Sequence, residues 1–197
     1  MEKNPDNPRG GAGRDLGMNT ALYVARVIHH DLTVANAASW QWWTALSEWD
    51  YKDGLIFIDD GTLANGASRG DEKMIETCKQ DGVFRTSKLL WTLGNYSFFI
   101  RPGMVRLSSV TNTDNTAEVM ASAYADNSFK WIVVVVVNSS REDKMIDLSF
   151  QSLPAGYCVQ QYKLYETSAR SDLQYKGIVG SQLLIPARSV VTLVGVE

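Results

Sequence analysis

The stretch WIVVVVV, residues 131–137, decides how the second half of this chain folds. After its tryptophan every residue is β-branched, and branched side chains favour a strand because they pack well on a pleated surface. The run is far too short to cross a bilayer, which takes about 20 apolar residues in a helix. Its unbroken apolar character predicts a buried central strand.

Short apolar runs recur on both sides of this strand, with turn residues such as Pro154-Ala155-Gly156 between them. These runs are Met104–Val110, Val119–Tyr124, Met145–Phe150, Tyr157–Tyr165, Leu183–Ile185 and Val190–Val196. Short strands at this spacing, with no helical pattern between them, predict an antiparallel β-sandwich. The boundary with the preceding part of the chain is expected near residue 101.

The first hundred residues show a different pattern. Asp15 can cap a helix that runs to about residue 30, and Thr86 or Ser87 can cap a second helix that runs to about residue 100. Residues 33–46 are predicted to form a buried strand that emerges into a long loop, in which GLIFID, residues 54–59, is a short hairpin strand. One strand between two helices belongs to a parallel α/β sheet and cannot stand alone. We therefore interpret this half as the edge of a larger α/β unit.

Composition and charge exclude several classes of function. The 197 residues carry 19 basic and 22 acidic side chains, a net charge of -3, and no basic stripe, so nucleic acid is not expected as a partner. Blocks of like charge are absent, and no membrane-surface helix is expected. Two cysteines without ligand spacing indicate no metal site, and no cofactor motif is present. The N-terminal stretch has no apolar core, so we expect no signal peptide.

Four segments resemble glycoside hydrolase family 30. They are GRDLGMNTALYVARVIHHDLTVANAASWQWW (13–43), DYKDGLIFID (50–59), SKLLWTLGNYSFFIRPGMVRL (87–107) and IPARSVVTLVG (185–195). The first two look most like the endo-β-1,6-galactanase branch of that family. The resemblance implies a (β/α)8 TIM barrel followed by an antiparallel β-sandwich.

A complete barrel of this kind takes about 250 residues. The resemblance therefore implies that residues 1–100 are the terminal βα units of a truncated barrel, with strand eight at Thr33–Trp43, and that residues 101–197 are the sandwich. Members of the family are retaining enzymes whose acid/base and nucleophile follow barrel strands four and seven. Glu2 is the nearest candidate for the nucleophile, but the family pattern puts it just past that position. We expect no catalytic residue in this chain.

The resemblance also implies a small sugar-binding site. Trp43 matches the tryptophan at the end of barrel strand eight that stacks on the sugar, and Trp49 and Tyr51 follow in a loop that could line a more distal subsite. Trp40 and Trp42 are expected to pack against the flanking helices.

The prediction is a C-terminal fragment of a retaining glycoside hydrolase for β-linked glycans, with β-1,6-galactan as first choice, inactive by itself. The expected partners are the polysaccharide and the missing N-terminal part of the barrel. A full-length parent would be secreted or periplasmic, while the localisation of this chain stays open. The alternatives are a non-catalytic carbohydrate-binding or structural β-sandwich, and a family relative acting on β-glucosides or β-xylans.

Overall fold

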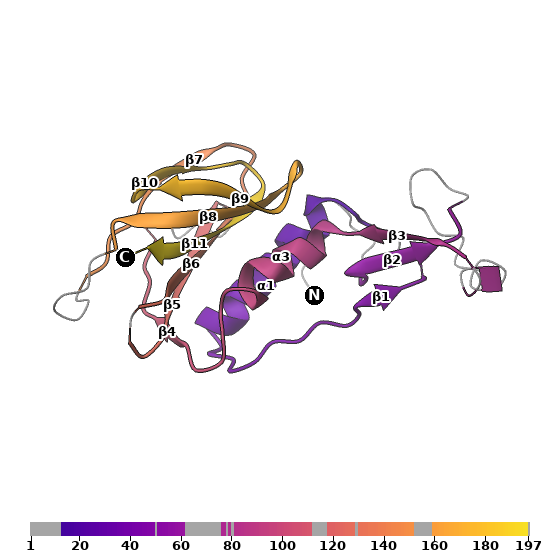
Figure 1. Ribbon diagram of the computed structural model, residues 1–197, viewed down its shortest axis with the longest axis horizontal. Helices are drawn as coiled ribbons and strands as arrows, with labels where there is room; N and C mark the ends of the chain where they lie inside the picture. Colours follow the sequence, from indigo (N-terminus) through magenta and orange to yellow (C-terminus); the bar gives the residue numbers. More distant parts are fainter. Residues whose placement is uncertain are drawn as a thin grey trace.

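The computed structural model describes residues 13–49, 51–61, 76–77, 79, 81–111, 118–128, 130–151 and 159–196. Its largest element is a six-stranded antiparallel sheet in the order β4-β5-β6-β11-β8-β9 (Figure 1). The strands are β4 (Val105–Leu107), β5 (Val119–Ala125), β6 (Ile132–Asn138), β8 (Gln161–Ser168), β9 (Ser171–Val179) and β11 (Ser189–Val196). The expected antiparallel β-rich half is confirmed.

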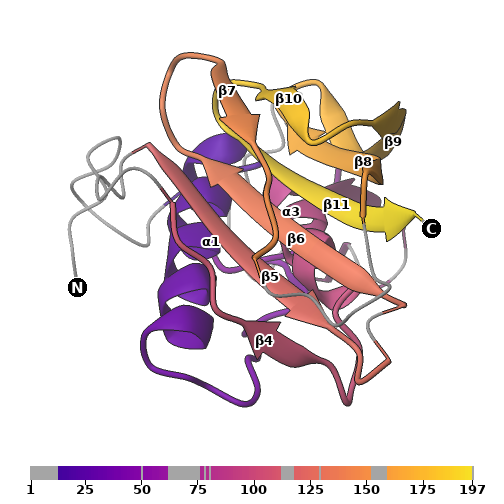
Figure 2. The ribbon, with the colours of Figure 1, turned by 90° about the vertical axis from the view of Figure 1, so that its left-hand side faces the viewer.

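The six-stranded sheet is covered on both faces. Helices α1 (Met18–Thr33) and α3 (Lys88–Ser97) lie against one face, as Figure 2 shows from the opposite side. A two-stranded sheet of β7 (Lys144–Asp147) and β10 (Gln182–Ile185) covers the other. Valines 133, 135 and 137 join the core on the helix side, and valines 134 and 136 join the second core. The molecule therefore has three layers, with β6 fully buried in the middle one.

Strand β9 is the strand of the large sheet that the sequence pattern missed, as it missed β3 (Val83–Thr86) of the small sheet described below. Strand β9 forms the edge of the large sheet, pairs only with β8 in the described structure, and most of its side chains are exposed or half-buried. The β8–β9 ladder also has register irregularities near Leu164/Tyr165 and Glu166/Ser168. An edge strand with polar residues on both faces lacks the apolar alternation that reveals a strand in a sequence. Cys78, Cys158 and the start of the predicted run at residue 157 lie outside the described residues.

Both predicted helices are present with small shifts in their ends. Asp15 lies before α1, where its two carboxylate oxygens accept hydrogen bonds from the Gly17 and Thr20 N–H groups at 2.8 and 2.7 Å. Ser87 is the N-cap of α3, and its hydroxyl accepts from the Leu90 N–H at 3.4 Å. The N-cap of α1 is therefore Gly17 and not the expected Asp15, although the Asp15 carboxylate still accepts from N–H groups of the first turn. These bonds satisfy N–H groups that a helix start leaves without partners. No described helix is long and apolar enough to span a membrane.

The prediction of a strand at Thr33–Trp43 is wrong. Helix α1 continues to Thr33, and residues 34–45 form no strand. The side chains nevertheless alternate as in an extended chain: Trp40 and Trp42 pack against the core with their rings stacked 5.8 Å apart, while Trp43 faces outward. Without a neighbouring strand along this segment there is no ladder of hydrogen bonds, so the extended chain is not a strand. Trp40 and Trp42 thus pack against the core that α1 and α3 share with the large sheet.

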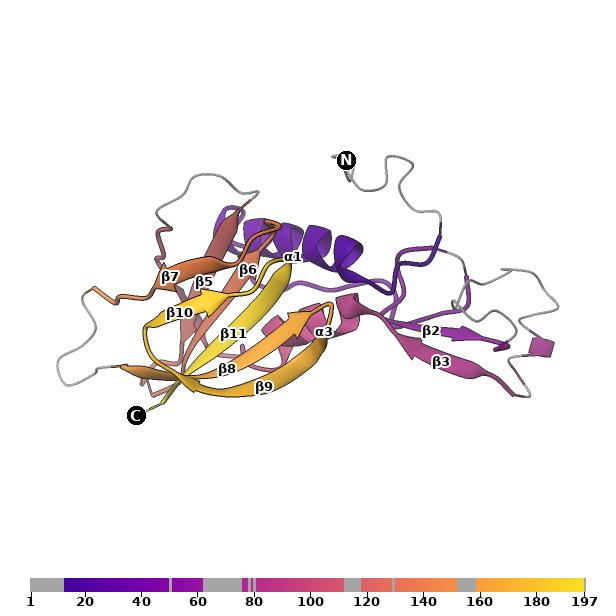
Figure 3. The ribbon, with the colours of Figure 1, turned by 90° about the horizontal axis from the view of Figure 1, so that it is seen from above.

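A small sheet lies on the far side of the helices from the large one (Figures 1 and 3). Strand β2 (Ile56–Asp59) is parallel to β1 (Leu46–Ser47) and antiparallel to β3 (Val83–Thr86). The hairpin strand expected within GLIFID is therefore confirmed, and β3 is its partner. The described part of the first hundred residues thus forms two helices and this three-stranded sheet.

Buried polar groups tie the helix layer to the large sheet. Asn95 of α3 and Thr192 of β11 are both fully buried. The Asn95 side-chain amide donates to the Thr192 hydroxyl at 2.9 Å, and that hydroxyl donates to the Asn95 carbonyl at 2.7 Å. Near the C-terminal end of α1, burial lowers the pKa of His29 to about 4, with further lowering from the charges of His30 and Arg106. His29 is thereby kept neutral near physiological pH.

Candidate functional site

Three large aromatic side chains project from residues 43–51, the segment around β1. Trp43 is 81% exposed, Trp49 44% and Tyr51 53%. Large rings are more often buried than exposed, because each removes a large apolar area from water when it packs. Each of the three exposed rings offers an apolar face to solvent, which suits contact with an apolar or ring-shaped ligand. We call Trp43, Trp49 and Tyr51 the aromatic segment.

The backbone beneath Trp43 is held in place. The Trp42 indole N–H donates to the Asp53 carbonyl at 2.7 Å, and the Thr44 N–H donates to the same carbonyl at 3.1 Å. The Leu55 N–H then donates to the Thr44 carbonyl at 3.1 Å, which leads into the parallel pairing of β1 with β2. The peptide bond between Trp43 and Thr44 is cis. Trp43 is thus exposed on a fixed support.

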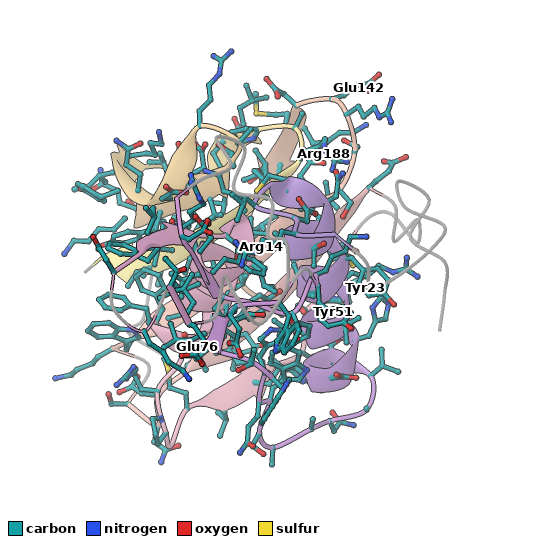
Figure 4. All side chains as sticks on the ribbon, turned by 90° about the vertical axis from the view of Figure 1, so that its right-hand side faces the viewer. Arg14, Tyr23, Tyr51, Glu76, Glu142 and Arg188 are labelled. Carbon is teal, nitrogen blue, oxygen red and sulfur yellow. The ribbon has the colours of Figure 1, made fainter. Side chains whose placement is uncertain are left out.

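Arg14 bonds the backbone of the loop that carries Trp49. Its guanidinium donates to the Glu48 carbonyl at 3.0 Å and to the Trp49 carbonyl at 3.4 Å. The same group donates to the Ile58 carbonyl at 2.7 Å and to the Asp59 carboxylate at 3.0 Å. The side chains of Arg14 and Asp59 are only 3% and 2% exposed, so this ion pair is interior. Figure 4 labels Arg14. One buried cation therefore joins the loop after β1 to the end of β2.

Asp59 is the shared acceptor of two arginines. Its carboxylate accepts from Arg14 and, at 2.9 Å, from Arg85 of β3, and it also accepts from the Gly61 N–H at 2.9 Å. Burial would raise the pKa of this carboxyl, but the hydrogen bonds it accepts and the two arginine charges hold the pKa below its ordinary value. Asp59 therefore stays ionised, which suits an ion pair and not a proton donor.

The other described carboxylates near the aromatic segment also have partners. Asp53 accepts from the buried Ser47 hydroxyl at 3.2 Å, and Asp31 accepts from the Trp40 indole N–H at 2.9 Å. Asp50 lies outside the described residues. Within the described ranges no group of three or more His, Cys, Asp or Glu residues could hold a metal ion.

A pocket of about 200 Å³ lies on helix α1. It is lined by Tyr23, Arg26, Val27, His30 and Asp31. The opposite face of the helix, which includes Ala21, Ala25 and Ile28, is buried in the core against the sheet and α3. The pocket therefore lies on the face of α1 that the core leaves uncovered; Figure 4 labels Tyr23.

Trp43, Trp49 and Tyr51, the residues singled out from the sequence, are all exposed. Arg14 bonds the backbone at Glu48 and Trp49. Sequence reasoning missed Arg14 and its role. Its partners are 34 to 45 residues away along the chain, and the long loop between them showed no periodicity from which this proximity could be inferred. The aromatic density of residues 40–51 was the signal that could be seen.

Comparison with known proteins supports a family relationship. Residues 3–57 match the model of O-glycosyl hydrolase family 30. A conserved exported protein from Bacteroides fragilis is 37% identical, with a TM-score of 0.72 over 90% of this chain and 33% of that one. No curated protein sequence matches the chain significantly.

Two enzymes share the fold at lower identity. A family 30 endoxylanase from Clostridium papyrosolvens is 19% identical, with a TM-score of 0.64 over 94% of this chain and 41% of that one. A family 30 subfamily 8 xylanase from Clostridium acetobutylicum is also 19% identical, with a TM-score of 0.61 over 94% of this chain and 42% of that one. The chain spans between a third and about two fifths of the length of these three proteins. The family match and the shared fold together support the assignment of this chain as a relative of glycoside hydrolase family 30.

Proposed function

We propose that this chain is the C-terminal part of a retaining glycoside hydrolase for β-linked glycans, and that the aromatic segment binds the sugar. The observation that carries the proposal is the exposure of Trp43, Trp49 and Tyr51 on a backbone fixed from below by Asp53 and Arg14. Aromatic faces stack on the apolar C–H faces of sugar rings, and a fixed support reduces the cost of ordering them on binding. Our first choice of substrate is β-1,6-galactan.

We further propose that the chain binds glycan without cleaving it. A retaining glycosidase needs two carboxyl groups about 5–5.5 Å apart, one of which must be protonated to act as the acid. Asp59 is held ionised between two arginines, and Asp53 and Asp31 accept hydrogen bonds from neighbouring side chains. These groups serve the structure of the site. The acid and the nucleophile would come from the remainder of a longer enzyme.

That remainder is the partner we propose for the small sheet. In the proposal, α1, the small sheet and α3 are the last units of a TIM barrel, and the missing N-terminal part packs beside them. Leu46 of β1 and Phe84 of β3 are 57% and 73% exposed, which leaves apolar surface for such contacts. This chain spans 33% of the exported Bacteroides fragilis protein, so a protein of that length has room for the additional barrel units that the proposal needs.

The test is a titration of the purified chain with β-1,6-galactan oligosaccharides, followed by tryptophan fluorescence. Binding should saturate in the wild type and be lost in Trp43→Ala. Trp131→Ala is the matched control, because Trp131 is 49% exposed but lies at the start of the sandwich strand β6. Loss of binding in Trp131→Ala with retention in Trp43→Ala would assign the site to the sandwich and contradict the proposal.

Substrate and activity need separate measurements. Parallel titrations with β-xylan and β-glucan oligosaccharides test the choice of galactan, since tighter binding of either would replace it. Release of reducing sugar by the chain should remain at background. Saturable release that Glu2→Gln abolishes would show that the chain cleaves glycans without a partner.

A further inference from the structure

We propose that Arg14 is a positioning residue that sets the geometry of Trp49 and Tyr51 for glycan binding. The proposal rests on the function proposed above and adds to it the residue that orders the site. Arg14 does not touch the ligand in this scheme, because its side chain is only 3% exposed. It acts through the backbone of the loop that carries the two rings.

The Arg14 guanidinium contacts two segments of the chain, the loop after β1 and the end of β2. On one side it donates to the carbonyls of Glu48 and Trp49, the residues that lead into Tyr51. On the other it donates to Ile58 and Asp59 at the end of β2. The guanidinium also lies over the ring of Phe57, 4.9 Å from its centroid, and this ring is fully buried. The Arg14 side chain therefore bonds the loop to the end of β2, in addition to the pairing of β1 with β2 at Ser47.

Only arginine can make these contacts together. A guanidinium is planar and offers five N–H donors in a fixed arrangement, while a lysine ammonium is a compact group with three. Asp59 balances the charge, and the three carbonyl oxygens replace the water that the cation loses on burial. Lysine at this position would keep the charge next to Asp59 but could not reach Ile58, Glu48 and Trp49 at once.

Arg85 provides a control in the same cluster. It donates to the same oxygen of Asp59 at 2.9 Å, is 25% exposed and belongs to β3. No contact from Arg85 to the Glu48 or Trp49 carbonyl is seen in the described part of the chain. Loss of Arg85 should therefore weaken the ion-pair cluster without freeing the loop, whereas loss of Arg14 should do both.

The experiment compares Arg14→Lys, Arg85→Gln and wild type in the full chain by two readouts. Hydrogen exchange compares the exchange rates of backbone amides in the loop, residues 46–53, with those in β6, which serves as an internal reference for global stability. Tryptophan fluorescence measures the affinity for β-1,6-galactan oligosaccharides. Arg14→Lys should speed exchange in the loop but not in β6, and weaken affinity about five- to tenfold through lost preorganisation. Arg85→Gln should leave the loop exchange and the affinity near wild type.

The outcomes separate this proposal from the one on which it rests. Unchanged loop exchange in Arg14→Lys, equal loop effects in Arg85→Gln, or faster exchange in β6 as well as the loop would each overturn the role of Arg14. Faster loop exchange with unchanged glycan affinity would also overturn it, because the loop would then not set binding. Faster loop exchange in a chain whose wild type binds no glycan would overturn the proposed function while supporting the ordering of the loop by Arg14.

Discussion

Replacing Thr192 by valine removes a hydroxyl that links the helix layer to the large sheet. Valine has nearly the same shape, so packing around β11 should change little. The hydroxyl makes two buried hydrogen bonds to Asn95, at 2.9 and 2.7 Å. Each contributes about 1 kcal/mol net, and stranding the buried amide N–H of Asn95 costs about 1–3 kcal/mol. Because these terms overlap, we expect Thr192→Val to lower the free energy of unfolding by about 3 kcal/mol.

A double-mutant cycle with Asn95→Ala isolates the interaction. Asn95→Ala removes the amide together with its Oδ1, a buried atom without a hydrogen-bond partner in the described structure. Thr192→Val should then cost less in the Asn95→Ala background, by about 1–2 kcal/mol, because no amide is left stranded. Urea unfolding at pH 7, monitored by circular dichroism, measures all four proteins. A cost below about 0.5 kcal/mol for Thr192→Val, or an equal cost in both backgrounds, would refute the reasoning.

Three further predictions concern stability. Asp59→Asn should destabilise the chain by about 3–5 kcal/mol in urea unfolding, because Arg14 would lose its buried counter-charge, and an effect under about 1 kcal/mol would contradict this. The folded chain keeps His29 neutral to a pKa of about 4 while the unfolded chain protonates it near 6.5. Stability should thus fall as the pH drops through this window, by less than about 3 kcal/mol, and His29→Gln should flatten the profile of urea midpoint against pH. Val135→Ala, in the buried middle strand, should cost about 2 kcal/mol in thermal or urea unfolding, whereas Met145→Ala, 70% exposed, should cost almost nothing.

Much of the fold could be predicted from local patterns. The valine run of β6 indicated a buried strand, and Ser87 indicated the start of α3, because both signals depend only on neighbouring residues. The segment 33–43 could not be predicted in this way. Its apolar residues are consistent with a strand, but a strand also needs a hydrogen-bonded neighbour, which no local pattern supplies. The sequence pattern missed edge strand β9 for the opposite reason. This strand pairs with β8 although its residues show no apolar alternation.

The candidate site, too, could be predicted from the sequence only in part. The residues of the aromatic segment were singled out by the resemblance to glycoside hydrolase family 30, and all three prove to be exposed. The ion-pair cluster of Arg14, Asp59 and Arg85 was not visible, because its members come from three separate segments. In the sequence, Asp59 was one of several acidic residues in a loop. Its near-complete burial between two arginines is a product of tertiary packing.

By itself the sequence determined which segments are apolar enough to be buried and where two helices begin, because these properties are written in side-chain chemistry and its spacing. Only the tertiary structure decided which segments are in contact. The helices pack on one face of the large sheet and β7 and β10 on the other, and Arg14 bonds the loop that follows β1. The physical reason is range. Hydrophobicity and capping act over a few residues, while a hydrogen bond or ion pair between distant segments exists only after the chain has brought them together.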